Sequence, residues 1–410
     1  MDLRYGREDE AFRGELRAWL EAEVPAHGRP PPPDDWPARR AYDTAWQRKL
    51  HDTGYAGLAW PKAFGGGGLP IQQQLVYLEE YARAGAPYVG VNFVGLMHAG
   101  PTLVAEGTDA QRSLHLPRIL RGESVWCQGF SEPGAGSDLA SLRTRAERHG
   151  DEYVVTGQKV WSTRAHVADW CELLVRTDPT APKHRGITWL ILDMHQPGVK
   201  VRPIRTIDGE SHFCEVFLDE ARVPVANRLG AENDGWRVAN VTLRFERGTA
   251  FAQHVITLRS QLLRVVTLAR SSRQDGRVAT SDDFRRTIGR LSAGIEALWR
   301  MTQMCISDAE QTGMPSPLGS AVKLRYSELA QEIAELAVRV VGRPALGWTA
   351  SDGAEADAAV ERDEAHVAAL SIADVVRDYL WSFQTTIAAG TSQIQRNLIA
   401  QRILGMPKGR

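Results

Sequence analysis

The chain has 410 residues, a formal net charge of -1, 43% hydrophobic residues and 24% charged residues. This length predicts two or three packed units, and the composition is typical of globular proteins. The near-neutral charge, without a run of Lys and Arg, argues against an obligate nucleic-acid partner. No stretch approaches the ~18 apolar residues of a membrane-spanning helix, so we expect no membrane association.

The N-terminus and the cysteines both favour a cytoplasmic protein. The first residues are polar and lack the apolar segment of a secretory signal. Cys127, Cys171, Cys214 and Cys305 are isolated, without a CxxC pair. This pattern favours reduced, buried thiols over a disulfide framework or a zinc site, and we expect no bound metal.

The first zone of the chain, residues 1–124, is predicted to be helical. Four apolar residues recur at three- and four-residue spacing, which makes one helical face: Phe12, Leu16, Trp19 and Leu20. A second helix is predicted over 71–84. The segment 60–68 between them contains four consecutive glycines. It indicates a flexible connecting loop rather than a phosphate cradle, because no GKS/T follows.

The second zone, residues 125–235, changes to a β pattern. Short runs rich in β-branched and aromatic residues are separated by glycine-containing turns, at 152–156, 173–177, 187–193 and 213–218. These runs do not alternate with helical patterns, so a sandwich or barrel is expected rather than a doubly wound parallel sheet.

The third zone, residues 236–410, returns to helical patterns. Long segments over 236–270, 281–312 and 317–341 suggest a helix bundle. Ser316 is expected to cap the last of these, with Pro317 in the first helical position. The polar segment 351–357 reads as a surface loop.

Two motifs in the second zone carry chemical information. The first is Ser-Glu-Pro-Gly-Ala-Gly-Ser-Asp at 131–138, and the second is Gly-Gln-Lys-Val-Trp-Ser-Thr at 157–163. Taken singly, they would also suit a glycine-rich turn and an ordinary buried tryptophan. Together with the Trp-Pro-Lys-Ala-Phe-Gly-Gly loop and the Gly-Thr-Ser-Gln-Ile-Gln-Arg-Asn tail, they make the chain resemble the acyl-CoA dehydrogenase family of flavoproteins over nearly its whole length.

The resemblance implies an α+β fold with three domains. These are an N-terminal helical domain (1–124), a middle β-barrel or sandwich domain (125–235) and a C-terminal four-helix bundle (236–410). It also implies FAD as cofactor, an acyl-CoA thioester as substrate, an electron-transfer flavoprotein as acceptor, and a homodimer or homotetramer. The sequence does not define the acyl group, nor whether CoA or a carrier protein bears it.

The resemblance also assigns residues to the cofactor. A flavin ring is flat and amphipathic, so it needs an aromatic wall and hydrogen-bond donors at its polar edge. The wall falls on Trp161, the facing hydroxyls on Ser131 and Thr163, and the pyrophosphate on Ser137, where glycines let backbone N–H groups approach. The implied FAD contacts are Gln128, Phe130, Ser131, Gly136, Ser137, Trp161, Ser162, Thr163, Thr391 and Gln393.

The catalytic base is the least obvious assignment. Members of the family remove the α-proton of the thioester, and many place the carboxylate directly before the Gly-Thr of the tail. In this chain that position is Ala389. A second branch places a glutamate on a helix of the C-terminal bundle, and this assignment falls on Glu246.

The helical pattern around Glu246 supports a catalytic role. Ala239, Leu243, Glu246 and Ala250 would share one face of a continuous helix. A carboxylate in a small, apolar stripe has a raised pKa, which suits a base that works near neutral pH. The alternative is a structural ion pair with a nearby arginine such as Arg244.

The resemblance implies the following reaction. Glu246 removes the α-proton and the β-hydride passes to flavin N5. Donors near the thioester oxygen carry the developing charge. The backbone N–H of Ala389 would still serve as one donor, since losing a side chain does not remove the amide. The implied substrate-binding residues are Ser137, Arg247, Ala389 and Gly390.

Two departures leave other functions open. An Arg-x-x-Phe-Gly segment that reaches a neighbouring FAD in many members is absent from 269–276, and the glycine turn near 342 is also altered. The chain could therefore be one subunit of a hetero-oligomeric acyl-CoA dehydrogenase that needs a partner for FAD binding or activity. A flavin oxidase or monooxygenase on the same scaffold is a further alternative, which Glu246 disfavours.

Overall fold

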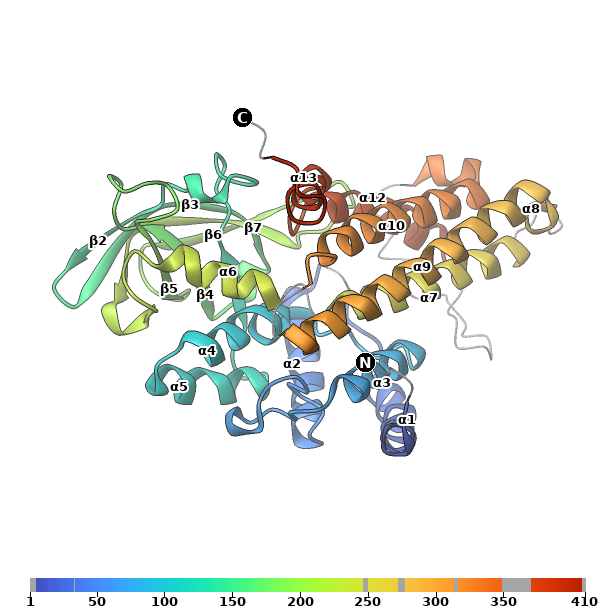
Figure 1. Cartoon of the computed structure of the whole chain (residues 1–410), viewed down its shortest axis with the longest axis horizontal. Coiled ribbons are helices and arrows are strands. Elements are labelled where there is room, and N and C mark those ends of the chain that lie inside the picture. Colours follow the sequence, from blue (N-terminus) through green and yellow to red (C-terminus); the bar gives the residue numbers. More distant parts are fainter. Residues whose placement is uncertain are drawn as a thin grey trace.

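The computed structural model describes residues 5–32, 34–245, 250–271, 277–312, 316–348 and 370–407. Figure 1 shows three parts: a sheet at one end, a layer of short N-terminal helices along one side, and long C-terminal helices at the other end. The helix α13 lies between the sheet and the long helices (Figure 1). Glu246 and Arg247 lie outside the described residues.

The N-terminal part is helical, as predicted. Its elements are α1 (Arg7–His27), α2 (Trp36–Asp52), η1 (Lys62–Phe64), α3 (Ile71–Arg83), η2 (Gly90–Asn92), η3 (Gly95–Ala99), α4 (Gly100–Glu106) and α5 (Asp109–Leu120). Leu16 and Leu20 are fully buried, and Phe12 and Trp19 pack against the same core. The predicted apolar face of α1 and the predicted helix over 71–84 are therefore confirmed.

The glycine-rich segment after α2 folds back on itself. Gly67 N donates to Gly57 O (3.2 Å), and Leu69 N donates to Leu58 O (2.9 Å). A Cβ at Gly66 would lie only 2.4 Å from the Cβ of Trp60, which is itself buried. The glycines therefore permit close packing of the loop around Trp60, which the expectation of a flexible connector did not include.

The middle part is one hydrogen-bonded sheet in the order β6-β7-β3-β2-β4-β5-β8, with β1 beside β4. Its strands are β1 (Trp126–Gly129), β2 (Arg145–His149), β3 (Glu152–Thr163), β4 (Trp170–Arg176), β5 (Ile187–Asp193), β6 (Val199–Ile204), β7 (Phe213–Pro224) and β8 (Arg228–Leu229). β1 and β2 pair with β4 in parallel, and the other pairs are antiparallel. The absence of a doubly wound sheet agrees with the prediction, and all four cysteines are buried and free, as expected.

The C-terminal part consists of α6 (Gly235–Phe245), α7 (Ala250–Ser271), α8 (Arg277–Thr280), α9 (Asp282–Thr312), α10 (Gly319–Val341), η7 (Arg343–Gly347), α12 (Ile372–Ser382), η8 (Phe383–Thr386) and α13 (Ser392–Arg402). The helices α7, α9, α10 and α12 pack around one apolar core, which agrees with the predicted bundle. Of the helical segment expected over 236–270, α6 and α7 cover the described residues, and 246–249 lie outside them. The expected surface loop at 351–357 lies outside the described residues.

The start of α10 differs from the prediction by two residues. It begins at Gly319, with Leu318 as its N-cap, rather than at Pro317. Ser316 still supports this end, because its hydroxyl accepts a hydrogen bond from the N–H of Leu318 at 3.3 Å. Local turn chemistry was therefore recognised correctly, while the helix boundary was not.

The three parts share one interior. Trp126 and Trp189 of the sheet, Val238 of α6 and many N-terminal residues belong to the same buried cluster. Helix α6 contacts both β5 and α4, and α3 contacts α7. The sheet, α6 and the N-terminal helices are therefore packed together at one junction.

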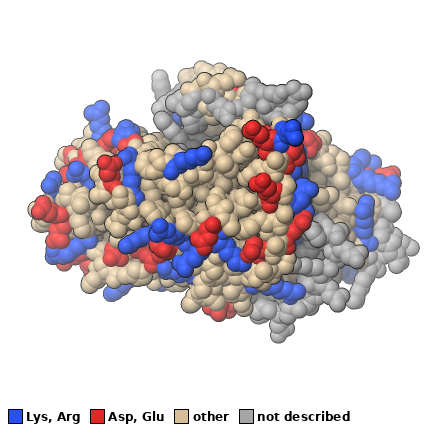
Figure 2. All heavy atoms as spheres, turned by 90° about the horizontal axis from the view of Figure 1, so that it is seen from below, with Lys and Arg blue, Asp and Glu red and all other residues tan. Residues whose placement is uncertain are grey.

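The surface shows mixed charge. In Figure 2, blue and red side chains are interspersed over the visible face, without a continuous basic area among its described residues. Within the described ranges, no helix combines the length and the apolar character that crossing a bilayer requires.

Candidate active site

The Ser-Glu-Pro-Gly-Ala-Gly-Ser-Asp motif forms an exposed turn after β1. Glu132 and Ala135 exchange two backbone hydrogen bonds of 3.0 Å, so the chain reverses at Pro133 and Gly134. Gly136 and Ser137 follow on the exposed side. A Cβ at Gly134 or Gly136 would meet nothing within 4 Å. The turn therefore presents bare backbone to open space, as a phosphate-binding turn does.

A buried ion pair supports this turn from below. Lys159 of β3 is fully buried, and its Nζ lies 2.8 Å from Oε1 of Glu132 and 3.1 Å from the carbonyl oxygen of Phe130. The carboxylate also accepts the N–H groups of Arg143 and Thr144. Burial alone would raise the pKa of Glu132, but the Lys159 ammonium and these N–H donors hold it below its ordinary value.

Sequence reasoning missed this pair, although both residues belong to the two motifs. The signal was available as a charged residue of opposite sign in each motif. Their contact depends on β3 lying beside the turn, which the sequence pattern alone does not show.

The end of β3 exposes Trp161. The β3–β7 pairing shifts register between Lys159 and Ser162, and Trp161 takes a left-handed conformation (φ 62°) within this irregularity. Its side chain is 56% exposed, whereas Ser162 is fully buried. An exposed tryptophan on a strained backbone, beside an open turn, offers a surface (the aromatic wall) against which a flat ligand can stack.

Three hydroxyl groups near this wall are available to a ligand. Among the described residues, the side-chain oxygens of Ser131, Ser137 and Thr163 have no hydrogen-bond partner, and all three residues are exposed or half-buried. By contrast, Phe130 is 4% exposed and packs in the core. Phe130 and Ser162 can therefore reach a cofactor only through their backbones.

Gln128, on β1, is held by other side chains. Its amide nitrogen donates to Oε1 of the buried Glu172 (2.8 Å) and lies 3.2 Å from Nδ1 of His98. The amide nitrogen is therefore occupied by the protein, and a cofactor contact from Gln128 would use its remaining atoms or its backbone.

The sequence leaves two possibilities for Arg164, an altered flavin environment or a side chain that points to solvent. It follows the Trp-Ser-Thr segment, also at positive φ (52°), and its guanidinium donates to the carbonyl oxygen of Gly90 and lies over the ring of Trp36. Burial lowers the pKa of Arg164 from its ordinary value. Arg164 therefore ties the Trp161 loop to the N-terminal helices.

Aromatic contacts connect Trp161 to the C-terminal bundle. Its ring meets Phe213 of β7 edge-on at 6.0 Å, and Phe213 stacks on Trp381 of α12 at 6.0 Å. Arg377 of α12 also approaches Glu210 at 3.5 Å. The helix α12, which leads towards the tail, therefore packs against the part of the sheet where Trp161 lies.

The tail turn at Ala389 and Gly390 is open. Both residues have positive φ (53° and 87°), and Ala389 is exposed. Their N–H groups have no hydrogen-bond acceptor within the described part of the chain. Thr391 caps α13, since its hydroxyl accepts the N–H of Ile394 at 3.2 Å, and Gln393 is exposed on the first turn of that helix.

The predicted base cannot be placed. Glu246 lies outside the described residues, as does the predicted CoA contact Arg247. Of the four positions expected to share its helical face, Ala239 is fully buried. The roles of Glu246 and Arg247 therefore stay predictions.

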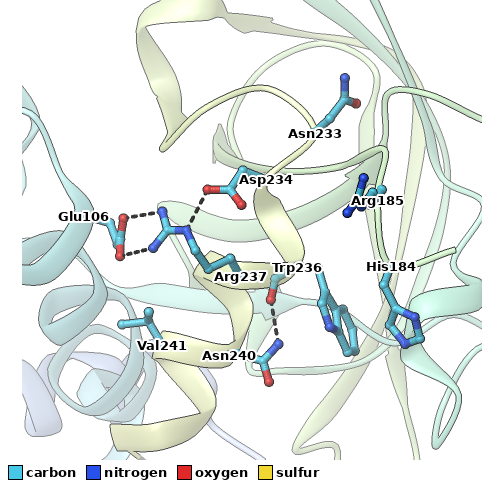
Figure 3. A pocket seen from close by; sticks show the side chains of 9 residues that line it. All are labelled: Glu106, His184, Arg185, Asn233, Asp234, Trp236, Arg237, Asn240 and Val241. Carbon is cyan, nitrogen blue, oxygen red and sulfur yellow. Dashed lines mark hydrogen bonds and ion pairs between the residues drawn. The ribbon is translucent and has the colours of Figure 1, made fainter. Parts of the chain in front are cut away.

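A pocket of about 770 Å³ opens between the loop before β5 and the start of α6 (Figure 3). Arg237 makes a bidentate ion pair with Glu106 (2.6 and 2.7 Å) and also bonds Asp234 (2.7 Å). His184 lies against the ring of Trp236 (centroids 5.0 Å apart). Arg185 has no carboxylate partner among the described residues, so this side of the pocket is basic.

The sequence analysis did not single out this pocket. The basic run Lys183-His184-Arg185 was the available signal. Lys183 pairs with Asp138 of the first motif at 2.8 Å, which connects this loop to the cofactor turn.

These features define a class: a three-part α–β–α protein with a cradle for a flat, phosphate-bearing cofactor and a polar pocket in which Arg185 has no carboxylate partner among the described residues. The chain matches three family models, described as the acyl-CoA dehydrogenase N-terminal domain (residues 6–123), middle domain (127–221) and C-terminal domain (233–404).

Comparisons with individual proteins agree with these family matches. Acyl-CoA dehydrogenase IpdE1 of Mycobacterium tuberculosis is 39% identical over 406 residues, which cover 97% of this chain and 98% of that protein. A solved "steroid ACAD", Tcur3481-Tcur3483, has a TM-score of 0.81 at 30% identity, with all of both chains covered. The ChsE4-ChsE5 complex from Mycobacterium tuberculosis has a TM-score of 0.77 at 33% identity and the same coverage.

The chain belongs to the acyl-CoA dehydrogenase family. It is an acyl-CoA dehydrogenase of the FAD-dependent type, and the resemblance seen in its motifs is confirmed. The observed geometry fits FAD, because an exposed aromatic wall, unpaired hydroxyls and an open glycine turn lie together.

Proposed function

We propose that this chain removes hydrogen across the Cα–Cβ bond of an acyl-CoA thioester, with Glu246 as the base for the α-proton. The observation that carries this proposal is the side chain of Ala389. At the exposed tail turn, a methyl group stands where a carboxylate would otherwise serve, so the base has to come from another segment. Glu246 is the carboxylate that the sequence pattern favours.

The tail turn supplies hydrogen-bond donors rather than a base. We assign the N–H groups of Ala389 and Gly390 to the thioester oxygen, because they lack acceptors in the described part of the chain. Donors fixed in place before the reaction stabilise the negative charge that develops on this oxygen as the α-proton leaves.

The cofactor would be held by the residues of the cradle. Trp161 would cover one face of the ring, and the hydroxyls of Ser131 and Thr163 would meet its polar edge. Gly136 and Ser137 would face the pyrophosphate, with Thr391 and Gln393 contributing from α13. Bound FAD supplies the acceptor for the β-hydride.

The Arg185 side of the pocket is the proposed site for the phosphates of CoA. Lys183 pairs with Asp138 of the first motif and Arg185 lines the pocket two residues later, whereas the guanidinium group of Arg237 is held by Glu106 and Asp234. Guanidinium groups bind phosphate through paired hydrogen bonds. Arg247, which follows Glu246 in the sequence, remains a further proposed CoA contact.

We also propose an identity for the acyl group and for the electron acceptor. A structural relative carries the words "steroid ACAD", which favours a bulky, ring-containing acyl thioester over a short linear one. An electron-transfer flavoprotein is the proposed acceptor, and a cytoplasmic location stays a prediction.

A hetero-oligomeric enzyme is the second candidate. One solved relative is a complex of two differently named chains, ChsE4 and ChsE5, and this chain lacks an Arg-x-x-Phe-Gly segment. If the purified chain is yellow by itself and bleaches with an acyl-CoA, the homo-oligomer is supported. If it turns yellow only with a co-expressed partner, the second candidate is correct.

The deciding experiment is Glu246→Gln in the FAD-loaded enzyme. General-base catalysis contributes about 10²–10⁴-fold in rate, so we expect kcat for flavin reduction to fall at least 100-fold, with FAD content unchanged. Glu335→Gln, which alters an exposed helical pair with Arg339, is the matched control. Turnover of Glu246→Gln within a few-fold of wild type would refute the assignment.

A further inference from the structure

Buried side chains from two other helices hold the tail turn. Lys323 of α10 donates from Nζ to the carbonyl oxygen of Thr385 at 2.7 Å. Gln395 of α13 donates from Nε2 to the carbonyl oxygens of Ala389 (3.1 Å) and Gly390 (3.3 Å). The segment is therefore fixed just before and directly at the two positive-φ residues.

Lys323 is buried without a counter-ion. It is 6% exposed and forms no ion pair within the described residues. Burial lowers the pKa of Lys323 to about 8. Its hydrogen-bond partner Thr385 lies in η8, which continues α12. The amine therefore lies at the C-terminal end of a helical segment, where the last carbonyl groups favour a cation or a hydrogen-bond donor.

The segment between Lys323 and Gln395 is also ordered by local bonds. The carbonyl oxygen of Gln384 accepts the N–H groups of Ile387 (3.0 Å) and Ala388 (2.9 Å). Gln331 of α10 approaches the hydroxyl of Thr386 at 3.3 Å. Restraint at Thr385 is therefore transmitted through a short, hydrogen-bonded stretch to Ala389.

Gln395 fits this turn closely. It is 2% exposed, and its amide nitrogen has to face the turn because carbonyl oxygens only accept hydrogen bonds. Its Oε1 has no hydrogen-bond partner among the described residues. A buried oxygen without a partner costs free energy, which the hydrogen bonds from Nε2 to the turn offset. Gly390 has a φ of 87°, which residues with a side chain rarely adopt, and a Cβ there would also lie 2.7 Å from the amide nitrogen of Gln395.

We propose that Lys323 and Gln395 are positioning residues, which hold the N–H groups of Ala389 and Gly390 ready for the thioester oxygen of the substrate. This inference rests on the proposed function and adds two residues to it. Neither residue needs to touch the substrate. Their effect is to keep Ala389 in a left-handed conformation that an alanine otherwise avoids, so that little reorganisation is needed when charge develops.

The test compares Lys323→Met and Gln395→Met with wild type, each as the FAD-loaded enzyme. Methionine keeps the approximate length of both side chains and removes the donor. We expect kcat to fall at least tenfold, with KM within threefold and FAD content unchanged. The double variant should lose little more than the worse single variant, because both residues restrain one turn. Lys200→Met, on exposed strand β6, is the control.

A spectroscopic readout separates positioning from general stability. The probe is a 2-enoyl-CoA with ¹³C at its thioester carbonyl, bound to the oxidised enzyme and observed by infrared difference spectroscopy. In wild type the carbonyl band should move to lower frequency than in free thioester, and both methionine variants should lose at least half of that movement. Unchanged bands, or kcat within twofold of wild type, would overturn the proposal.

The same spectrum distinguishes this inference from the assignment of the base. Glu246→Gln should keep the full carbonyl movement while losing turnover. If Glu246→Gln instead retains turnover but Lys323→Met loses the carbonyl movement, the base assignment fails and the positioning role stands. If Lys323→Met unfolds the enzyme, Gln395→Met and its double-variant comparison decide, and loss of folding in both variants would overturn the proposal in favour of a structural role.

Discussion

At the scale of single residues, Trp161 is held in a costly state. Its left-handed backbone (φ 62°) costs roughly 1–2 kcal/mol for a residue with a Cβ. Its large ring is also 56% exposed, so the chain gains little from burying it. Strain of this kind concentrates at ligand sites, where the surrounding structure maintains it. The residue therefore suits a ligand-covered wall better than a packing role.

Trp161→Gly tests this interpretation. Glycine removes the backbone strain, which offsets the lost contact with Phe213, so we expect the melting temperature of the apoprotein to stay within a few degrees of wild type. The dissociation constant for FAD, measured by flavin fluorescence titration, should rise at least tenfold.

Glu220→Gly is the matched control for that variant. Glu220 has a similar positive φ (55°) and lies on the exposed part of β7, so its replacement should leave FAD affinity unchanged. Equal FAD affinity in Trp161→Gly and wild type would contradict the role of Trp161 as a wall.

At the scale of elements, a buried carboxylate joins α1 to α3. Glu80 of α3 is 2% exposed and accepts hydrogen bonds from Arg13 (3.1 Å), Arg17 (2.7 Å) and Arg83 (2.7 Å). Burial alone would raise the pKa of Glu80, but the three guanidinium groups bring it down to about 2. The two helices are therefore held together by charge as well as by their apolar faces.

The pH dependence follows from the sign of this shift. The folded-state pKa lies below the unfolded value of about 4.3, so the stabilisation is fully present above that pH and is lost as the pH falls towards 2. Glu80→Gln should lower the free energy of unfolding at pH 7 by roughly 2–3 kcal/mol. The difference between variant and wild type should be smaller at pH 3, as judged by chemical denaturation.

Glu21→Gln provides the comparison for Glu80. Glu21 also pairs with Arg83, at 3.0 Å, but its side chain is 55% exposed. An exposed pair contributes about 0–1 kcal/mol, so this variant should resemble wild type at both pH values. If both variants behave alike, the special role of the buried carboxylate is wrong.

At the scale of the whole molecule, apolar side chains remain exposed at the C-terminal end. Ile387, Leu404 and Met406 are 65%, 65% and 54% exposed, and they flank α13. In Figure 1 this helix lies between the sheet and the long helices of the bundle. A contiguous exposed apolar patch marks an interaction site, and we infer that this end of the chain takes part in the predicted oligomer.

A charged substitution there tests the oligomer. Leu404→Asp should shift the native mass, measured by native mass spectrometry, from a dimer or tetramer towards the monomer. If a second chain completes the cofactor site, FAD content should fall at the same time. Leu114→Asp, at a 44% exposed position on α5, should leave the native mass unchanged. A monomeric wild type would contradict the oligomer prediction directly.

Elements with strong local patterns were predicted well. The strand expected over 187–193 is β5, and the helix expected over 71–84 is α3 (Ile71–Arg83). Both depend on periodicity within a short window, which the sequence displays directly. The start of α10 was placed two residues too early, because turn residues such as Ser316 and Pro317 are compatible with more than one helix boundary.

The sequence by itself determined the order of helical and β zones, the cofactor motifs, the missing carboxylate at Ala389 and the family. These are local or motif-based properties, carried by residue type and spacing. Only the tertiary structure decided that Trp161 is exposed while Ser162 beside it is buried, that Lys159 pairs with Glu132, and that Lys323 and Gln395 meet the tail turn. Each of these depends on strand register or on helices far apart in the chain, and contacts of that kind form only when the whole fold brings their partners together.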